Sequence, residues 1–404
     1  MQKKALEMCK NQFKKIENIS EYNQQKVLKA FIDCGVSESH FAGSTGYGYN
    51  DRGRDKLDEV YAKIFGAEDA LVRSTIVSGT HALTVALFGV LRPFDKVLSV
   101  TGKPYDTLND VISSGNDFGS LNDFKIEFDY TEYDKNDEIY FSNIKNKMSK
   151  EKYKVIYIQR SRGYTLRDSL SVDKIKKIIK YVKKIDQDVI VMVDNCYGEF
   201  AEKAEPTEVG ADLVIGSLIK NPGGGIAPTG GYIAGKKQLI EKCACRLTCP
   251  GIGKEIGATL GINRKLFMGI YNAPHVVGEA LKTAVFTAAI FEIMGYEVSP
   301  KYNDDRCDIV QSVVLRSRNA LINFCRGIQQ GSPIDSFVSP EPWDMPGYEN
   351  QVIMAAGTFT LGSSIELSAD GPLRNPYAVW IQGGLSFYTA QIGILFAAEK
   401  IINQ

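Results

Sequence analysis

The sequence predicts an α/β protein: a mostly parallel β-sheet with helices on both faces, followed by a smaller α+β domain. Short, continuous runs of β-branched and apolar residues recur along the chain with helical stretches between them, which is typical of parallel strands that are buried on both faces. One intervening stretch is strongly amphipathic, as expected of a helix that covers a sheet. From about residue 290, strand-like runs lie closer together, which indicates a change of architecture.

Composition narrows the class of protein. The chain has 404 residues, 44% of them hydrophobic, and its 48 basic residues balance 48 acidic ones. This length suits one large and one smaller domain, and the balance of charge gives no sign of a nucleic-acid or membrane partner. Eight scattered cysteines indicate a reduced protein rather than a disulfide scaffold.

Neither a signal peptide nor a membrane span is predicted. The first 20 residues contain no apolar stretch of the required length. The apolar stretch 283–295 is too short to cross a bilayer and carries Glu292. We therefore expect a cytoplasmic protein.

The N-terminal part of the chain reads as helical. Residues 1–40 have helical spacing of apolar residues in separate pieces, and we assign 1–45 to an N-terminal helical segment. A glycine-rich stretch then precedes a helix over 55–65, which Gly66 can end. Residues 77–91 read as a turn that opens into a buried helix.

Strands and helices alternate in the next part of the chain, which we assign to a large domain over 46–290. Its expected strands cover 95–100, 153–159, 188–194, 211–217 and 229–235, with an amphipathic helix over 172–186. The remaining residues, 291–404, form the expected small domain. Its strand-like runs cover 351–359, 363–370 and 377–384, and a C-terminal helix begins near Ser386.

Several polar residues stand where these strands end. Asp194 closes one strand, and Ser217 and Lys220 follow the next. Tyr105 follows the strand over 95–100, and the buried helix begins at residues 78–80. Because ligands of parallel α/β sheets gather at the carboxyl ends of the strands, we expect these residues to share one site.

Each of these residue types meets a need of pyridoxal 5′-phosphate. The aldehyde of that cofactor bonds to a lysine amine, here Lys220. Its ring nitrogen needs a carboxylate beside it, which Asp194 supplies. Its phosphate suits the start of a helix, where Ser78, Gly79 and Thr80 offer free N–H groups.

The motifs themselves resemble those of a known family. The pair "VDNCYGEF" and "GSLIKNPGGG" is similar to the aspartate and Ser-x-x-Lys pair of fold-type I pyridoxal-phosphate enzymes. Together with "SGTHAL" and "VTGKPYDTL", it resembles the cystathionine β-lyase and methionine γ-lyase group, and the aluminium resistance proteins within it. The similarity runs in order from about residue 41 to 404, which makes it more specific than any single motif.

The resemblance implies the fold-type I architecture with a seven-stranded-type sheet, and it implies roles for particular residues. Lys220 would anchor the cofactor and carry a proton, and Tyr105 would stack on its ring and assist catalysis. Arg374 would bind the carboxylate of an amino-acid substrate. The resemblance also implies a homodimer or homotetramer with the site at a subunit interface. The remaining cofactor-binding residues would be Asp194, Ser78, Gly79, Thr80, Ser217 and, from the neighbouring subunit, Tyr49 and Arg54.

Some assignments stay open at this stage. Tyr47 and Arg52 fit the neighbour's contribution nearly as well as Tyr49 and Arg54. The chain has "QRSRGY" where the lyases usually have Asn-Pro, so Arg160, Ser161 or Arg162 could contact the cofactor or the substrate. His81 has no assigned role. The spacing of Cys243, Cys245 and Cys249 fits no common zinc pattern, so we predict no metal site.

The resulting interpretation is a pyridoxal-phosphate-dependent carbon–sulfur lyase that acts on a sulfur-containing amino acid by α,β- or α,γ-elimination. Two alternatives remain. One is another reaction of the same cofactor: transamination, aldol cleavage or γ-replacement. The other is a non-catalytic protein that binds the cofactor in a stress response.

Overall fold

A computed structural model describes residues 1–403 apart from 116, 133–136 and 346–347. Seven strands form the larger sheet, in the order β1-β7-β6-β5-β4-β2-β3. All of them run parallel except β7, which is antiparallel to both of its neighbours. The predicted fold class is confirmed. The strands are β1 Asp69–Arg73, β2 Lys96–Ser99, β3 Glu127–Tyr130, β4 Val155–Gln159, β5 Ile190–Asp194, β6 Leu213–Ser217 and β7 Gly231–Gly235.

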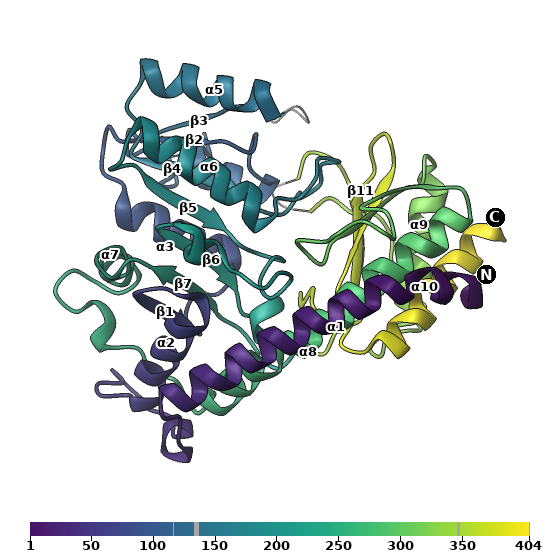
Figure 1. Cartoon of the computed structure of the whole chain (residues 1–404), viewed down its shortest axis with the longest axis horizontal. Helices are drawn as coiled ribbons and strands as arrows, with labels where there is room; N and C mark the ends of the chain where they lie inside the picture. Colours follow the sequence, from purple (N-terminus) through teal and green to yellow (C-terminus); the bar gives the residue numbers. More distant parts are fainter. Residues whose placement is uncertain (116, 133–136, 346–347, 404) are drawn as a thin grey trace.

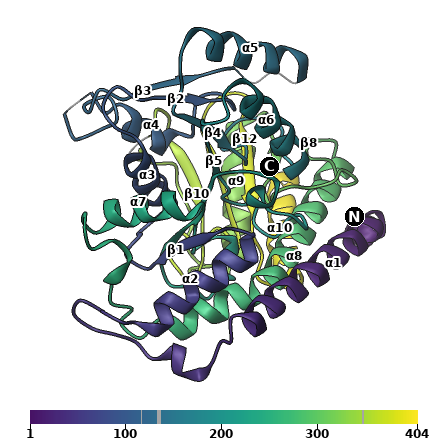
Figure 2. The same cartoon turned by 60° about the vertical axis from the view of Figure 1, so that its left-hand side comes forward.

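Helices cover both faces of this sheet because its central strands β4, β5 and β6 are buried along their whole length. One face packs against α3 (Gly79–Val90), α4 (Asp106–Ile112) and α7 (Lys237–Leu247). The opposite face packs against α2 (Arg52–Phe65) and α6 (Val172–Ile185), and Figure 2 shows the two layers. Helix α5 (Asp137–Lys150) lies beside α6.

In helix α6, the apolar residues predicted from the sequence pattern are the ones that pack against the sheet. The hydroxyl of Ser171 accepts a hydrogen bond from the backbone N–H of Lys174 and so caps the helix at its start. Its apolar stripe is buried as the sequence predicts: Val172, Ile175, Ile178, Ile179 and Val182.

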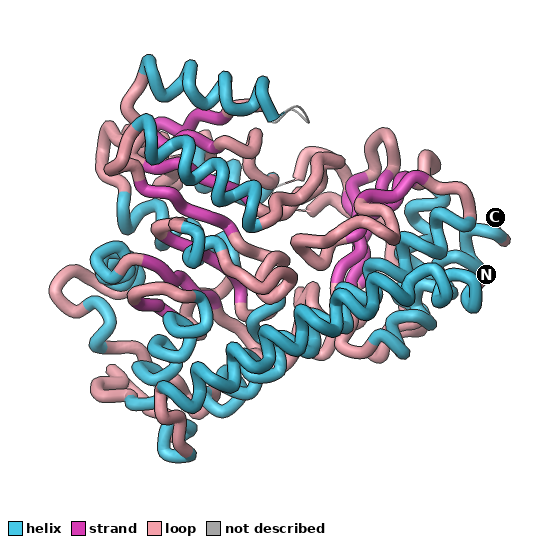
Figure 3. The backbone as a smooth tube through the Cα atoms, viewed as in Figure 1, coloured by secondary structure: helices cyan, strands magenta, loops and turns pink. Residues whose placement is uncertain are grey.

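A second sheet of five antiparallel strands follows, in the order β10-β11-β12-β9-β8; Figure 3 shows it apart from the larger sheet. Helices α9 (Arg318–Gln330) and α10 (Phe387–Ile402) pack together beside it. The run 363–370 is only partly a strand, because β11 begins at Ser368. These strands are β8 Glu297–Ser299, β9 Gln311–Val314, β10 Val352–Ala355, β11 Ser368–Pro372 and β12 Ala378–Gln382.

Helix α1 (Gln2–Asp33) is one continuous helix of 32 residues, so the expectation of separate helical pieces is wrong. It lies along α8 (Asn263–Ile293), a second long helix that reaches from the larger sheet to the smaller one (Figure 1). The polar Asn23 is buried in this helix, and its amide donates to the carbonyl oxygens of Phe200 and Glu202, which satisfies its hydrogen-bonding groups.

Among the described residues, no helix combines the length and the apolar character that crossing a bilayer requires.

Candidate active site

Asp194 and Lys220 come from adjacent parallel strands. Asp194 is the last residue of β5 and pairs in register with Ile215 of β6. Strand β6 ends at Ser217, and Lys220 follows directly before a short 3₁₀ turn over Asn221–Gly223. Both residues therefore lie at the carboxyl edge of the sheet, where the sequence places them.

This edge opens into a cavity of about 390 Å³ between the two sheets. Residues of the larger sheet line one side of the cavity, and residues of β10, β11 and β12 line the other. The structure brings most of the predicted site residues together here. They are Ser78, Gly79, Thr80, Tyr105, Asp194, Ser217, Lys220 and Arg374.

Lys220 lies against an aromatic ring, with its Nζ 4.0 Å from the ring centroid of Tyr197. Burial lowers the pKa of Lys220, but Cys196, Tyr197 and Asp194 outweigh burial and hold the pKa well above its ordinary value. The amine therefore carries a proton, which it must lose before it can bond to a carbonyl carbon.

Asp194 is buried and has few hydrogen bonds. Its Oδ1 accepts from the N–H of Cys196 at 3.1 Å, and its Oδ2 accepts from the hydroxyl of Tyr157 at 3.4 Å. Burial raises the pKa of Asp194, while the charge of Lys220 opposes that shift. A protonated ring nitrogen beside this carboxyl would stabilise its ionised form.

The start of α3 offers an anion site. The Oγ of Ser78 accepts from the N–H of His81 at 3.0 Å and so caps the helix, whose N-terminus faces the cavity. The hydroxyl of Ser217 is buried, lines the same cavity and has no hydrogen-bond partner among the described residues. An orphaned buried hydroxyl beside a helix start is what a bound phosphate would satisfy, so the residues fit pyridoxal 5′-phosphate.

Tyr105 is tied to this helix start. Its hydroxyl lies 3.0 Å from the Oγ1 of Thr80, and its backbone N–H donates to Gln159. Burial raises the pKa of Tyr105 far above its ordinary value, so the phenol keeps its proton and can donate a hydrogen bond.

Among the described residues, three arginines line the cavity, and one of them, Arg167, donates to the backbone carbonyl of Gln159 at 2.9 Å. Arg374 is exposed at the rim of the cavity. Arg162 is buried; its Nη1 donates to Ser299 and Ser312, while its Nε and Nη2 have no partner in the part of the chain that the structure describes. Of the alternatives considered for this loop, Ser161 also lines the cavity. Arg160 does not line it, because its guanidinium is paired with Glu202 at 2.7 Å.

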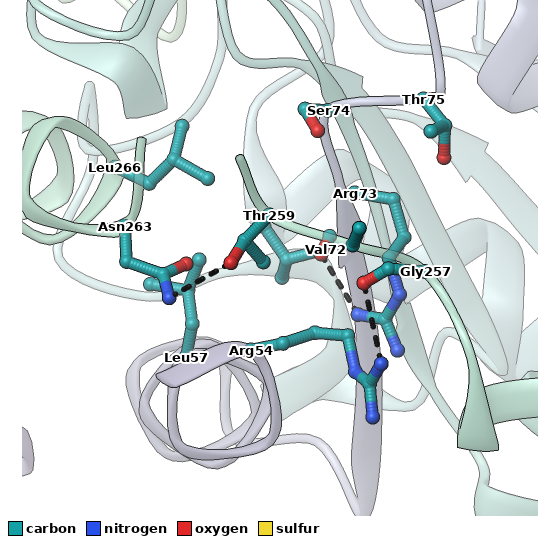
Figure 4. Close-up of a pocket in the computed structure, with 11 residues that line it drawn as sticks. Arg54, Leu57, Val72, Arg73, Ser74, Thr75, Gly257, Thr259, Asn263 and Leu266 are labelled. Carbon is teal, nitrogen blue, oxygen red and sulfur yellow. Dashed lines mark hydrogen bonds between the residues drawn. The ribbon is translucent and has the colours of Figure 1, made fainter. Parts of the chain in front are cut away.

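Tyr49 and Arg54 do not line this cavity. Tyr49 is exposed, and so are its alternatives Tyr47 and Arg52. Arg54 is buried in its own chain, where Nη1 donates to the carbonyl oxygens of Gly48 and Gly257. Figure 4 shows its guanidinium beside Gly257 in a small separate pocket. In this arrangement only Arg52 of the two arginines is free to reach another subunit.

Sequence reasoning missed several aromatic and polar residues of the cavity, two of which (Tyr164 and Tyr197) follow strands β4 and β5 of the larger sheet. Tyr164, Tyr197, Tyr348, Asp370, Trp380 and Gln382 all line the cavity. Asp370 carried little signal, because the run 363–370 also contains Glu366 and three serines.

The remaining candidates have local explanations. The Nδ1 of His81 accepts from the N–H of Val77 at 3.2 Å, which closes the turn before α3. All cysteines are free. The part of the chain that the structure describes contains no cluster of three residues able to hold a metal ion.

Comparisons with known proteins agree with this geometry. A family model described as methionine gamma-lyase matches residues 1–402. The uncharacterized protein YnbB of Bacillus subtilis (strain 168) is 50% identical over 393 residues, covering 97% of this chain and 93% of that protein.

Solved structures are also similar. A carbon–sulfur lyase involved in aluminium resistance from Clostridium novyi NT has a TM-score of 0.94 at 52% identity, covering 99% of this chain and 94% of that one. The pyridoxal-5′-phosphate-dependent protein YhfS of Escherichia coli has a TM-score of 0.65 at 16% identity, covering 96% and 97%, and shows the shared fold.

Proposed function

The chain belongs to the methionine gamma-lyase family, and from that premise we propose that it is a pyridoxal-phosphate-dependent carbon–sulfur lyase acting on a sulfur-containing amino acid. The cofactor is pyridoxal 5′-phosphate. The observation that carries the proposal is the convergence of Lys220, Asp194, the orphaned hydroxyl of Ser217 and the start of α3 on one cavity.

Each residue of the site is expected to bind a different part of this cofactor. Lys220 would bond to its aldehyde carbon, and Asp194 would pair with its ring nitrogen. Ser217 and the first turn of α3 would hold its phosphate, and Tyr105 would lie against its ring. When bound, the cofactor withdraws electrons from the Cα of an amino acid and so makes the Cα–H bond acidic.

The chain then supplies proton transfer and positioning. The amine of Lys220, once freed from the cofactor, accepts the Cα proton. The phenol of Tyr105 keeps its proton and is our candidate to donate it to a departing thiolate. Arg374 and the two uncommitted N–H groups of Arg162 are candidates to hold the substrate carboxylate.

Product analysis tests the reaction. We expect the purified enzyme, given a panel of sulfur-containing amino acids, to release a thiol, a keto acid and ammonia. A new aldehyde would identify an aldolase, and an amino-group transfer would identify an aminotransferase. Binding of the cofactor without any product would identify a non-catalytic protein, and each of these three outcomes contradicts the lyase.

A Ser217→Ala substitution tests the phosphate site. Loss of a hydrogen bond to a charged group costs about 1.5–3 kcal/mol, so we expect the cofactor to bind ~10-fold more weakly or worse. Titration of the apoenzyme with pyridoxal phosphate measures the effect. Ser363→Ala is the matched control, because Ser363 is also buried and without a partner but does not line the cavity. Equal affinity of the two variants would exclude Ser217 from the site.

We further propose that the enzyme is at least a dimer in which Tyr47 or Tyr49 completes the neighbour's site. Both rings are exposed and lie 5.8 Å apart on a loop outside their own cavity. Mixing inactive Lys220→Ala chains with inactive Tyr47→Phe/Tyr49→Phe chains should restore part of the activity, because a mixed dimer contains one complete site. Mixtures that stay inactive although the chains exchange would refute the shared site.

A further inference from the structure

The face of the small sheet that borders the cavity carries a buried carboxylate. Asp370 lies on β11, in register with Met354 of β10 and Trp380 of β12. Because residues paired in register point to the same face, these three side chains form a row across the sheet. All three line the cavity that contains Lys220.

Asp370 has hydrogen bonds but no ion pair. Its Oδ2 accepts from the Nε2 of Gln382 at 3.0 Å. Burial raises the pKa of Asp370, while hydrogen bonding from Tyr164 and Gln382 and the more distant charge of Lys220 oppose that shift. Within the described part of the chain, no lysine or arginine nitrogen lies within 4.0 Å of its carboxylate. Asp370 is only 8% exposed, and without a cation at ion-pair distance its ionised form loses more solvation energy than it regains.

Aromatic rings surround the same spot. The ring of Tyr164 lies 5.2 Å from that of Trp380 and 5.8 Å from that of Tyr348, measured between centroids. The indole N–H of Trp380 is buried and has no acceptor among the described residues, although Trp380 lines the cavity.

A carboxylate beside aromatic faces is a combination that binds cations. The carboxylate supplies charge, and the electron-rich faces of tyrosine and tryptophan add attraction to ammonium groups. We propose that Asp370, Tyr164 and Trp380 form a subsite for a positively charged group at the far end of the substrate. The inference rests on the proposed lyase, and it names a substrate class: sulfur amino acids whose departing thiol carries an ammonium group.

Two substrates of nearly equal shape test the subsite. S-(2-aminoethyl)-L-cysteine ends in an ammonium group, whereas S-propyl-L-cysteine ends in a methyl group. We expect wild-type holoenzyme to prefer the aminoethyl compound by about tenfold or more in kcat/KM for thiol release and in the affinity read from its visible spectrum. In Asp370→Asn, efficiency with the aminoethyl compound should fall to the level of the propyl compound, which should change little.

Controls separate charge from folding. Asp370→Asn keeps the shape of the side chain, and retained absorbance of bound cofactor reports that it folds. Ser368→Ala alters a neighbouring cavity residue on the same strand without removing charge, so it should keep the preference. The wild-type comparison needs no variant.

The outcomes distinguish this subsite from the lyase itself. Thiol release from both compounds with equal efficiency in the wild type would overturn the subsite and leave the lyase standing. A preference that survives in Asp370→Asn would overturn the role of Asp370. Absence of both thiol and spectral change with either compound would overturn the subsite, and the panel of other sulfur amino acids then decides the lyase separately.

Discussion

Replacing Lys220 by alanine should lower kcat by more than about 1,000-fold. The substitution removes the amine that bonds to the cofactor and also the base that accepts the Cα proton. No other lysine is placed to take over, because the only other lysine that lines the cavity among the described residues is Lys103, which is exposed. Steady-state thiol release with saturating pyridoxal phosphate measures the effect.

Two matched variants sharpen this result. Lys220→Arg keeps the positive charge beside Asp194 but cannot bond to an aldehyde, so it should be as inactive as the alanine variant. Lys103→Ala removes the other cavity lysine, and in this variant Lys220 should still bond to the cofactor. A small primary amine added to Lys220→Ala should restore part of the rate. Full activity in Lys220→Arg would show that charge, rather than the nucleophilic amine, matters at this position.

Asp194→Asn should give the second-largest loss, about 100- to 1000-fold in kcat. An amide cannot hold a proton on the ring nitrogen by its charge, so the cofactor withdraws electrons less strongly. The change is nearly isosteric and leaves Lys220 in place, so the variant should still bind the cofactor and stay coloured.

This combination separates electronic from structural effects. Retained visible absorbance with a large loss of kcat supports the pairing of Asp194 with the ring nitrogen. Retained absorbance with near-normal kcat would contradict it. Because an uncharged partner no longer balances Lys220, the absorbance band should also shift with pH differently from that of the wild type.

The centre of the site could be predicted from sequence because its residues depend on local structure. Asp194, Ser217 and Lys220 follow buried strands that are recognisable from composition, and parallel strands bring their carboxyl ends to one edge. Ser78 caps a helix that begins at the same edge. No long-range pairing has to be known to place these four residues together.

The side of the cavity formed by the small sheet could not be predicted in this way. The place of Asp370 depends on its pairing with Met354 and Trp380 across three strands, and a shift of one residue would turn the carboxylate to the other face. Strands β1, β3, β8 and β9 were likewise missing from the prediction. Of these, β3 and β8 are partly exposed strands at the edges of their sheets, so they lack a continuous apolar run.

Arg54 shows another limit of sequence patterns. The family resemblance suggested that it reaches a neighbouring subunit, yet the guanidinium donates to backbone carbonyls of Gly48 and Gly257. The glycines around it allow such close backbone approach, and Gly48 has a positive φ of 66°. A pattern of residue types does not reveal which hydrogen-bond acceptors a long side chain reaches in the folded protein.

The most direct test of the account is the site of covalent attachment. Purified protein loaded with pyridoxal phosphate is reduced with borohydride, digested and mapped by mass spectrometry. We expect a visible band that disappears on reduction and a pyridoxyl group on the peptide that contains Lys220. A colourless protein that takes up no cofactor, or a label on any other lysine, would contradict it.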